Sequence, residues 1–294
     1  MKIFIAGGTG FVGGHLKREL LKSGHELRVL VHKRSPETES AVEQVEGDVT
    51  RLESFTQAVS GCDAVINLVG IIREFPSRGV TFESLHVQAT ANMLAAALKS
   101  GVNRYLQMSA LGARPNAVSK YHKTKFRAEG LVRTSSLSWT IMRPSLIFGP
   151  KDAFVNMLAR QMRLAPVMPV IGDGRYRLQP IHADDVARCF ARALEMPETS
   201  GQCYELCGNN RMSYVELLDA VAAALGKSAP LKPQAPLGLM KLVIPIMQHL
   251  PQFPITMDQL QMLIEENICD GRWKEVFQFE PIDFNTGIAE YLRP

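Results

Sequence analysis

The sequence of 294 residues lacks long apolar runs and a strong excess of one charge. No stretch reaches the roughly 18 consecutive apolar residues that a membrane-spanning helix needs, so none is expected. The 33 basic and 29 acidic side chains leave a net charge of +4, and the basic residues are spread along the chain. This distribution argues against a nucleic-acid-binding surface.

Cysteine and histidine show no pattern typical of a cross-linked or metal-bound protein. The five cysteines, at positions 62, 189, 203, 207 and 269, are odd in number and lack the spacing of a disulfide framework. Cys203 and Cys207 lie in an apolar, strand-like stretch, and we interpret them as core thiols rather than a metal site, which fits a reducing compartment. The seven histidines have no metal-site spacing. The first expected strand begins at residue 3, leaving no room for a signal peptide, so we expect a cytoplasmic protein, peripheral to the inner face of a membrane as an alternative.

The sequence does contain short apolar runs that alternate with helical patterns. Together with the 46% apolar composition, this alternation predicts a doubly wound parallel α/β sheet with ligands at the carboxyl ends of its strands. Strands are expected at residues 3–6, 26–31, 42–46, 63–69, 104–109 and 139–143, and helices at 52–59, 81–100 and 121–134 after a first helix carrying Leu16, Leu20 and Leu21.

A glycine-rich turn joins the first strand to the first helix. Residues 7–13 read Gly-Gly-Thr-Gly-Phe-Val-Gly. At such a turn, backbone N–H groups and the helix dipole point at a phosphate. We expect Gly7 to permit the tight turn, Gly10 to let a pyrophosphate approach, and Gly13 to let the helix pack closely. In this strand–turn–helix context the motif predicts dinucleotide binding, hence a Rossmann domain.

The end of the second strand favours NADP(H) over NAD(H). An NAD site places an acidic residue here, on the ribose hydroxyls. This strand instead ends in His32, Lys33 and Arg34, and the first acid is Glu37. Cationic side chains attract a 2′-phosphate that a carboxylate would repel. Either Lys33 or Arg34 is the expected contact, and a solvated charged loop is the alternative.

A second group of residues predicts proton transfer. Ser109 ends an expected strand, and Tyr121 and Lys125 are four residues apart, which puts them on one face of a helix. An ammonium near a phenol lowers the phenol pKa, so Tyr121 could exchange a proton with a substrate hydroxyl or carbonyl. Lys125 could also hold the cofactor ribose, while Ser109 offers a hydrogen bond to the substrate oxygen.

The second half of the chain has a different character. Proline becomes frequent, helices are expected at residues 154–163, 184–196 and 213–225, and a strand at 202–206. We therefore divide the chain into a dinucleotide-binding core at 1–150, joined by returns from 175–210, and a smaller α/β lobe at 151–294 that mainly binds substrate. Residues 228–255 combine six prolines with the apolar stretch 237–247. This segment is a lid, part of the core, or an interaction segment that contacts a membrane or a partner complex through 236–250.

These motifs together resemble an extended or atypical short-chain dehydrogenase/reductase related to nucleotide-sugar epimerases. The matching residues are, in order, 7–13, Gly47-Asp48-Val49, Asn67-Leu68-Val69-Gly70, Ser109, Tyr121 with Lys125, Arg143-Pro144-Ser145 and 182–187. The resemblance implies that Asp48 lies by the adenine, and that Pro144 and Ser145 flank the nicotinamide. The cofactor-binding residues so expected are Gly7, Thr9, Gly10, Phe11, Val12, Gly13, His32, Lys33, Arg34, Asp48, Val49, Leu68, Val69, Gly70, Lys125, Pro144 and Ser145.

The tail directs the comparison within this family. Residues 254–263 resemble a branch that includes the NADPH-binding accessory subunit of respiratory complex I and its bacterial relatives. Members of that branch often bind cofactor without known turnover. Two functions therefore stay open: an NADP(H)-dependent oxidoreductase or epimerase acting on a small molecule through Ser109, Tyr121 and Lys125, or a non-catalytic NADPH-binding subunit or assembly factor of a membrane complex.

Overall fold

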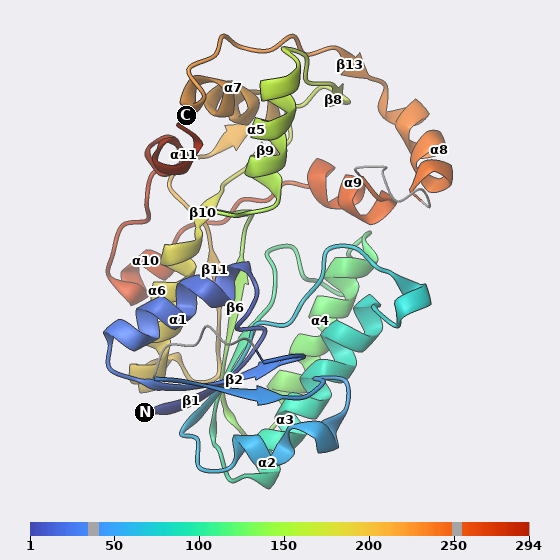
Figure 1. The fold of residues 1–294 in the computed structure, drawn as a ribbon. Coiled ribbons are helices and arrows are strands. Elements are labelled where there is room, and N and C mark those ends of the chain that lie inside the picture. Colours follow the sequence, from blue (N-terminus) through green and yellow to red (C-terminus); the bar gives the residue numbers. More distant parts are fainter. Residues whose placement is uncertain (35–40, 249–254, 294) are drawn as a thin grey trace. The chain divides into compact units, whose positions relative to one another are not determined.

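A computed structural model describes residues 1–34, 41–248 and 255–293 (Figure 1). It consists of two compact units. The first combines Met1–Pro144 with Ala183–Glu205, and the second combines Ser145–His182 with Leu206–Pro294.

The first unit contains a seven-stranded sheet in the order β11-β6-β5-β4-β1-β2-β3. All pairings from β3 to β6 are parallel, which confirms the expected doubly wound α/β fold. The strands are β1 (Lys2–Ala6), β2 (Glu26–Val31), β3 (Val42–Glu46), β4 (Ala64–Asn67), β5 (Arg104–Met108), β6 (Ser138–Pro144) and β11 (Gln202–Leu206).

Helices cover both faces of this sheet. On one face α1 packs against α6, and on the other α3 packs against α2 and α4 (Figure 1). The helices are α1 (Phe11–Lys22), α2 (Thr56–Val59), α3 (Ala89–Lys99), α4 (Lys120–Thr134) and α6 (Ala183–Glu195). Three-residue 3₁₀ turns occupy Leu52–Ser54, Pro76–Arg78 and Pro197–Thr199.

The central strands are buried on both faces, as expected for a parallel sheet between two helical layers. Phe4 in β1 and Val65 in β4 are inaccessible to solvent and belong to one apolar core, which Tyr105 of β5 joins. The ring of Phe55 stacks on that of Phe4 with 6.0 Å between centroids. This core fixes the carboxyl ends of β1, β4 and β5 relative to one another.

Two of the expected helices differ from the prediction. Residues 52–59 form a 3₁₀ turn followed by the single turn of α2 rather than one helix. The helix expected at 81–100 begins with a π-helical stretch, Glu83–Gln88, and becomes α-helical only at Ala89. A pattern of period 3.6 does not reveal such a local insertion, and π-helical turns are frequent at functional sites.

The second unit combines three short strand pairs with six helices in its described part. Its apolar core contains Phe148, Leu217 and Phe284. The pairs are β7 (Ile147–Phe148) with β10 (Ile181–His182), β8 (Val170–Ile171) with β13 (Gln234–Ala235), and β9 (Arg177–Leu178) with β12 (Met212–Ser213). The helices are α5 (Phe154–Leu164), α7 (Tyr214–Ala224), α8 (Leu237–Met247), α9 (Met257–Ile264), α10 (Trp273–Phe277) and α11 (Phe284–Leu292).

Local capping signals in the second unit follow the sequence closely. The Ser213 side chain accepts a hydrogen bond from the Glu216 backbone, and the Glu216 side chain accepts one from the Ser213 backbone, so the two residues form a capping box at α7. Thr256 and Gln259 form a second capping box at α9. Among the described helices, none is both long and apolar enough to cross a bilayer.

One expectation about cysteine was wrong. Cys207 and Cys269 form a disulfide in the second unit, with a sequence separation of 62 and 6.1 Å between their Cα atoms. The Trp273 indole N–H donates to the Cys207 carbonyl at 3.0 Å beside it. Cys62 and Cys189 are buried free thiols, and Cys203 is half-buried and free. Spacing along the chain does not show which cysteines meet in the fold.

Candidate functional site

The glycine turn is shaped to expose backbone N–H groups. Gly7 has φ +80°, in the left-handed region that favours glycine, and its carbonyl accepts from the Gly10 N–H at 3.0 Å. Gly10 is the N-cap of α1. Within the described residues no side chain caps this terminus and its first turn holds no acid, so an anion here would meet the N–H groups directly.

The helix and the turn are too close for a side chain at position 13. A Cβ on Gly13 would lie 2.5 Å from the Gly7 carbonyl oxygen and 2.6 Å from the Gly8 Cα. Gly8 is also tightly placed, because its Cβ would lie 2.8 Å from the Val29 Cγ1. By contrast, a Cβ on Gly14 would meet nothing within 4 Å. Thr9, Phe11 and Val12 are the other expected cofactor residues on this turn, and Val12 is buried in α1.

The carboxyl ends of β2 and β3 place the predicted adenosine-binding residues. His32, Lys33 and Arg34 are exposed, and the Arg34 backbone N–H donates to the Glu46 carboxylate at 3.0 Å. Glu37 lies outside the described residues.

Asp48 and Val49 follow β3 as the motif predicts. Burial opposes ionisation of Asp48, but two hydrogen bonds from Thr50, at 2.8 and 2.7 Å, outweigh it and lower the pKa of Asp48. The Val49 carbonyl accepts from the Asn92 side chain at 2.9 Å. The turn is therefore held by side chains from its own loop and from α3.

A buried polar network that the sequence did not reveal supports the end of β4. Asn67 is inaccessible to solvent, and its Oδ1 accepts from the Val69 N–H at 3.0 Å. Its Nδ2 donates to Gln107 at 3.1 Å and to Tyr105 at 3.3 Å on neighbouring β5. This network fixes the Leu68-Val69-Gly70 segment, which is expected to contact the cofactor.

Lys125 reaches this segment from α4. Its Nζ donates to the Val69 carbonyl at 3.2 Å and to the Met108 carbonyl at 3.3 Å, and a Cβ on Gly70 would lie 2.8 Å from it. Burial lowers the pKa of Lys125 to about 8, against the opposing effect of the Glu129 carboxylate. The structure thus brings Lys125, Val69 and Gly70 together at the carboxyl ends of β4 and β5.

Tyr121 lies one helical turn before Lys125 in an aromatic setting. Its ring meets that of His86 edge-on at 5.3 Å and that of Phe82 at 5.9 Å. Burial raises the pKa of Tyr121 to about 12. This direction is opposite to the lowering that we expected from Lys125, because the loss of solvation of the phenolate dominates.

Ser109 directs its hydroxyl into the protein. Its Oγ donates to Glu129 Oε1 at 2.6 Å, and both side chains are buried. Glu129 also accepts from Arg143, at 2.7 and 2.6 Å, and from Arg133 at 2.9 Å. Burial opposes the charge of Arg143, but the bonds to Glu129 raise its pKa. The one proton of Ser109 is therefore already engaged.

His86 lies in the π-helical stretch and was not predicted as a site residue from the sequence. Its Nδ1 lies 2.8 Å from the Thr124 hydroxyl, and its Nε2 lies 3.2 Å from the Ile71 backbone. Burial lowers the pKa of His86 to about 2, and the charge of Lys125 acts in the same direction. A neutral imidazole thus links Tyr121, through ring contact, to the loop after Gly70.

The buried neutral state of His86 predicts an acid-sensitive stability. Below pH 6.5 the unfolded chain binds a proton that folded His86 refuses, so stability is complete above pH 6.5 and falls as the pH drops towards about 2. The expected loss is about 2 kcal/mol between pH 6.5 and pH 5, from roughly 1.4 kcal/mol per pH unit. Urea denaturation across this range should show a shallower pH dependence for His86→Asn. Equal slopes for the two proteins would contradict the buried neutral imidazole.

The remaining predicted residues lie in different surroundings. Pro144 ends β6 in the first unit, where its carbonyl accepts from the Leu111 N–H at 2.9 Å. Ser145 begins the second unit, and its Oγ donates to the Gln179 carbonyl at 2.6 Å. Asp184 in the first turn of α6 lies 2.5 Å from His15 Nδ1 on α1, which favours a structural role for this acid.

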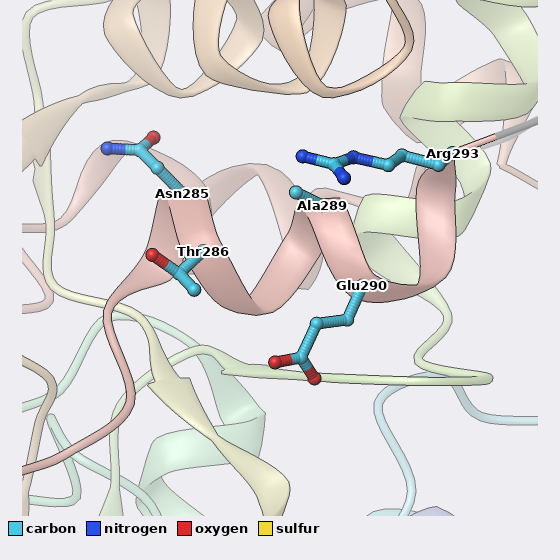
Figure 2. A pocket seen from close by; sticks show the side chains of 5 residues that line it. All are labelled: Asn285, Thr286, Ala289, Glu290 and Arg293. Atoms are coloured by element: carbon cyan, nitrogen blue, oxygen red, sulfur yellow. The ribbon is translucent and has the colours of Figure 1, made fainter.

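A surface hollow of about 440 Å³ lies along α11 in the second unit. Figure 2 shows the Arg293 side chain extending back over Ala289, with Glu290 directed away from it. No residue that the sequence singled out lines this hollow. Among the described residues, no group of three or more histidine, cysteine, aspartate or glutamate side chains could hold a metal ion.

The doubly wound sheet, the glycine turn and the lysine at the ends of β4 and β5 define a nucleotide-binding protein of the short-chain dehydrogenase/reductase type. More particularly, the chain belongs to the NAD dependent epimerase/dehydratase family, whose model matches residues 3–207. This membership supports a nucleotide cofactor of the NAD type.

Three comparisons place the chain among known proteins. It is 29% identical over 227 residues, 74% of its length, to NADH dehydrogenase (ubiquinone) 1 alpha subcomplex subunit 9, mitochondrial, of Dictyostelium discoideum, and spans 62% of that relative's length. It is 25% identical over 314 residues to a 2-alkyl-3-oxoalkanoate reductase of Stenotrophomonas maltophilia, covering 96% of this chain and 92% of the relative. The solved UDP-glucose 4-epimerase of Thermotoga maritima has a TM-score of 0.77 at 18% identity, covering 99% and 97% of the two chains, and shares the fold.

Proposed function

We propose that the chain is an NADP(H)-dependent oxidoreductase that acts on a hydroxyl or carbonyl group of a small molecule. The observation that carries the proposal is the position of Lys125, whose Nζ bonds to the Val69 and Met108 carbonyls one helical turn from Tyr121. A phenol and an amine at the carboxyl ends of parallel strands lie where this fold binds its ligands. When bound, NADPH supplies the hydride.

Each side chain has a distinct part in the proposed reaction. Tyr121 donates the proton to the substrate oxygen during reduction, which its raised pKa permits because the phenol stays protonated. Lys125 holds the ribose side of the cofactor and, when charged, stabilises a transient phenolate. Ser109 can donate to the substrate only by releasing Glu129, so its contribution is expected to be the smallest of the three.

The preference for NADP(H) rests on the exposed bases after β2. Lys33 and Arg34 stand where an NAD site would have an acidic residue. They follow β2, which pairs with β1, the strand that leads into the glycine turn. The remaining proposed cofactor contacts are residues 7–13, 48–49 and 68–70, together with Pro144 and Ser145.

Titration of the nucleotide-stripped protein tests this preference. We expect NADPH to bind more tightly than NADH, and Lys33→Glu with Arg34→Glu to weaken NADPH at least about tenfold, because two attractive charges become repulsive. NADH affinity should change little. Lys22→Glu, at the far end of α1, is the control and should leave both affinities unchanged. Tighter binding of NADH by the unaltered protein would contradict the proposal and favour an epimerase with resident NAD.

Turnover is tested with Tyr121→Phe. The variant retains the ring contacts with His86 and Phe82 but lacks the proton, so we expect turnover to fall by at least about a hundredfold with unchanged NADPH affinity. Since the Stenotrophomonas relative is named for 3-oxoalkanoates, 2-alkyl-3-oxoalkanoates belong in the substrate screen beside other carbonyls and quinones. Unchanged turnover of an identified substrate would exclude Tyr121 as the proton donor.

A second candidate function is a non-catalytic NADPH-binding subunit or assembly factor of a membrane complex. The Dictyostelium relative is named as a subunit of such a complex, and the engaged proton of Ser109 fits a site without turnover. In this case residues 236–250, of which 249 and 250 lie outside the described residues, would contact the partner or the inner face of the membrane. Very slow NADPH release, or stable folding only with NADPH bound, would favour this function.

A further inference from the structure

Two segments of the second unit contain basic residues but no acidic ones. Residues 153–172 and 220–248 hold neither aspartate nor glutamate. Their five basic residues are Arg160, Arg163, Lys227, Lys232 and Lys241. Lys232 is paired with Asp219 at 2.5 Å, whereas Arg160 and Lys241 are exposed. All charges within the two segments are therefore positive, and the neighbouring Asp219 neutralises only Lys232.

The two segments are neighbours in the fold. β8 and β13 pair in parallel, with Val170 opposite Gln234. Ahead of these strands, Val167 forms a bridge with Leu231, and the Met168 N–H donates to the Leu231 carbonyl at 2.8 Å. A single residue, Pro236, separates β13 from helix α8. Both elements belong to the second segment (Figure 1).

Large apolar side chains are exposed along this same region. Leu164 at the end of α5 is 83% exposed, and Leu231 is 69% exposed. On α8, Leu242 and Ile246 are 72% and 75% exposed and lie four residues apart, on one face of the helix. Leu239 shares that face at 55% exposure. We call these side chains, with Lys241, the apolar–basic surface.

Exposed apolar side chains beside basic ones are better suited to contact with a lipid surface than to exposure to water. A helix of 11 residues is about 16 Å long, half of what a bilayer requires, so α8 cannot span one. A short helix with an apolar face and basic flanks lies in the headgroup region, where lysine and arginine attract anionic lipids. We propose that the apolar–basic surface docks the protein on a bilayer containing anionic phospholipid. The proposal does not depend on the proposed activity, because every residue involved belongs to the second unit.

Sedimentation of the full chain with vesicles at low salt tests the proposal. We expect binding to phosphatidylcholine vesicles that contain phosphatidylglycerol, and much weaker binding to phosphatidylcholine alone. The double variant Leu242→Ser/Ile246→Ser should lower partitioning at least about tenfold, because two apolar anchors are lost. Lys241→Glu should lower binding to anionic vesicles several-fold and leave binding to neutral ones unchanged.

Matched controls lie at the end of α3 in the first unit. Leu98 is 49% exposed and Lys99 is its exposed neighbour, so Leu98→Ser and Lys99→Glu make the same chemical changes elsewhere. Both should bind vesicles as the unaltered protein does. Since circular dichroism and NADPH affinity report folding separately, a loss of vesicle binding with both retained supports the surface itself.

A direct readout comes from Leu242→Trp, whose fluorescence should shift to the blue when anionic vesicles are added. Failure of the unaltered protein to bind these vesicles, or equal binding by the α8 and α3 variants, would overturn the proposal. A dimer that the Leu242→Ser/Ile246→Ser variant converts to a monomer would overturn it too, by showing that a second copy covers the surface. NADPH titration remains informative in every case, so the failure of this proposal and of the proposed function are distinguishable.

Discussion

Gly13→Ala is expected to abolish NADPH binding and to lower the free energy of unfolding by about 3 kcal/mol, the upper part of the usual range for an overpacked site. The added Cβ would lie 2.5 Å from the Gly7 carbonyl oxygen and 2.6 Å from Gly8. Both contacts are with backbone, which cannot turn aside as a side chain can. The turn must open, and the N–H groups proposed to bind the cofactor phosphate would move with it.

The adjacent glycine provides a control of identical chemistry. Gly14→Ala adds the same methyl group in the same helix, where nothing lies within 4 Å. Alanine also has the better helix propensity, so stability should rise by up to about 1 kcal/mol with unchanged NADPH affinity. Fluorescence titration and urea denaturation of both variants measure the two effects. If Gly13→Ala binds NADPH as Gly14→Ala does, the turn is not the phosphate site.

Glu129→Ala is expected to lower the free energy of unfolding by about 3–5 kcal/mol, the usual cost of leaving a buried charge without its partner. Glu129 is inaccessible to solvent and accepts two hydrogen bonds from Arg143 and one from Ser109. Without it, the half-buried Arg143 guanidinium loses its bidentate partner and keeps the more distant Glu205, at 3.4 Å. Thermal and urea denaturation provide the measurement.

A bidentate pair on the surface serves as the control for this variant. Arg127 donates to Glu83 at 2.6 and 2.9 Å, a geometry close to that of Arg143 with Glu129, but both side chains are more than half exposed. Glu83→Ala should therefore cost less than about 1 kcal/mol, because water replaces the lost partner. Comparable losses in the two variants would mean that burial of Glu129 is not the source of its effect.

The strands could be predicted from the sequence because the residue pattern within each strand indicates how it is buried. β2, β3 and β11 have the predicted residue ranges, although β3 and β11 are half-exposed edge strands, and β1 begins one residue earlier. A central parallel strand such as β1 is buried on both faces and is mostly apolar, so no distant partner is needed to recognise it. The glycine turn could also be predicted, since the positive φ of Gly7 favours glycine and the backbone around Gly13 leaves no room for a Cβ.

The parts that escaped prediction depend on residues distant in sequence. Glu129 was passed over because a glutamate on a helix is usually exposed, and only the fold brings Arg143 and Ser109 to it. The raised pKa of Tyr121 follows from burial, which four-residue spacing to Lys125 cannot report. His86 was hidden for a similar reason, because its π-helical segment interrupts the period by which helices are recognised.

The bond between Cys207 and Cys269 ties the stability of the second unit to the chemistry of its surroundings. The cross-link closes a loop that includes α7, α8 and α9, and so restricts the unfolded chain. Reduction of the bond removes that restriction and leaves two buried thiols, Cys207 and Cys269. The free energy of unfolding of this chain therefore depends on the thiol–disulfide ratio as well as on temperature and denaturant. Values measured in air refer to the cross-linked chain, and values measured with reductant refer to the reduced chain.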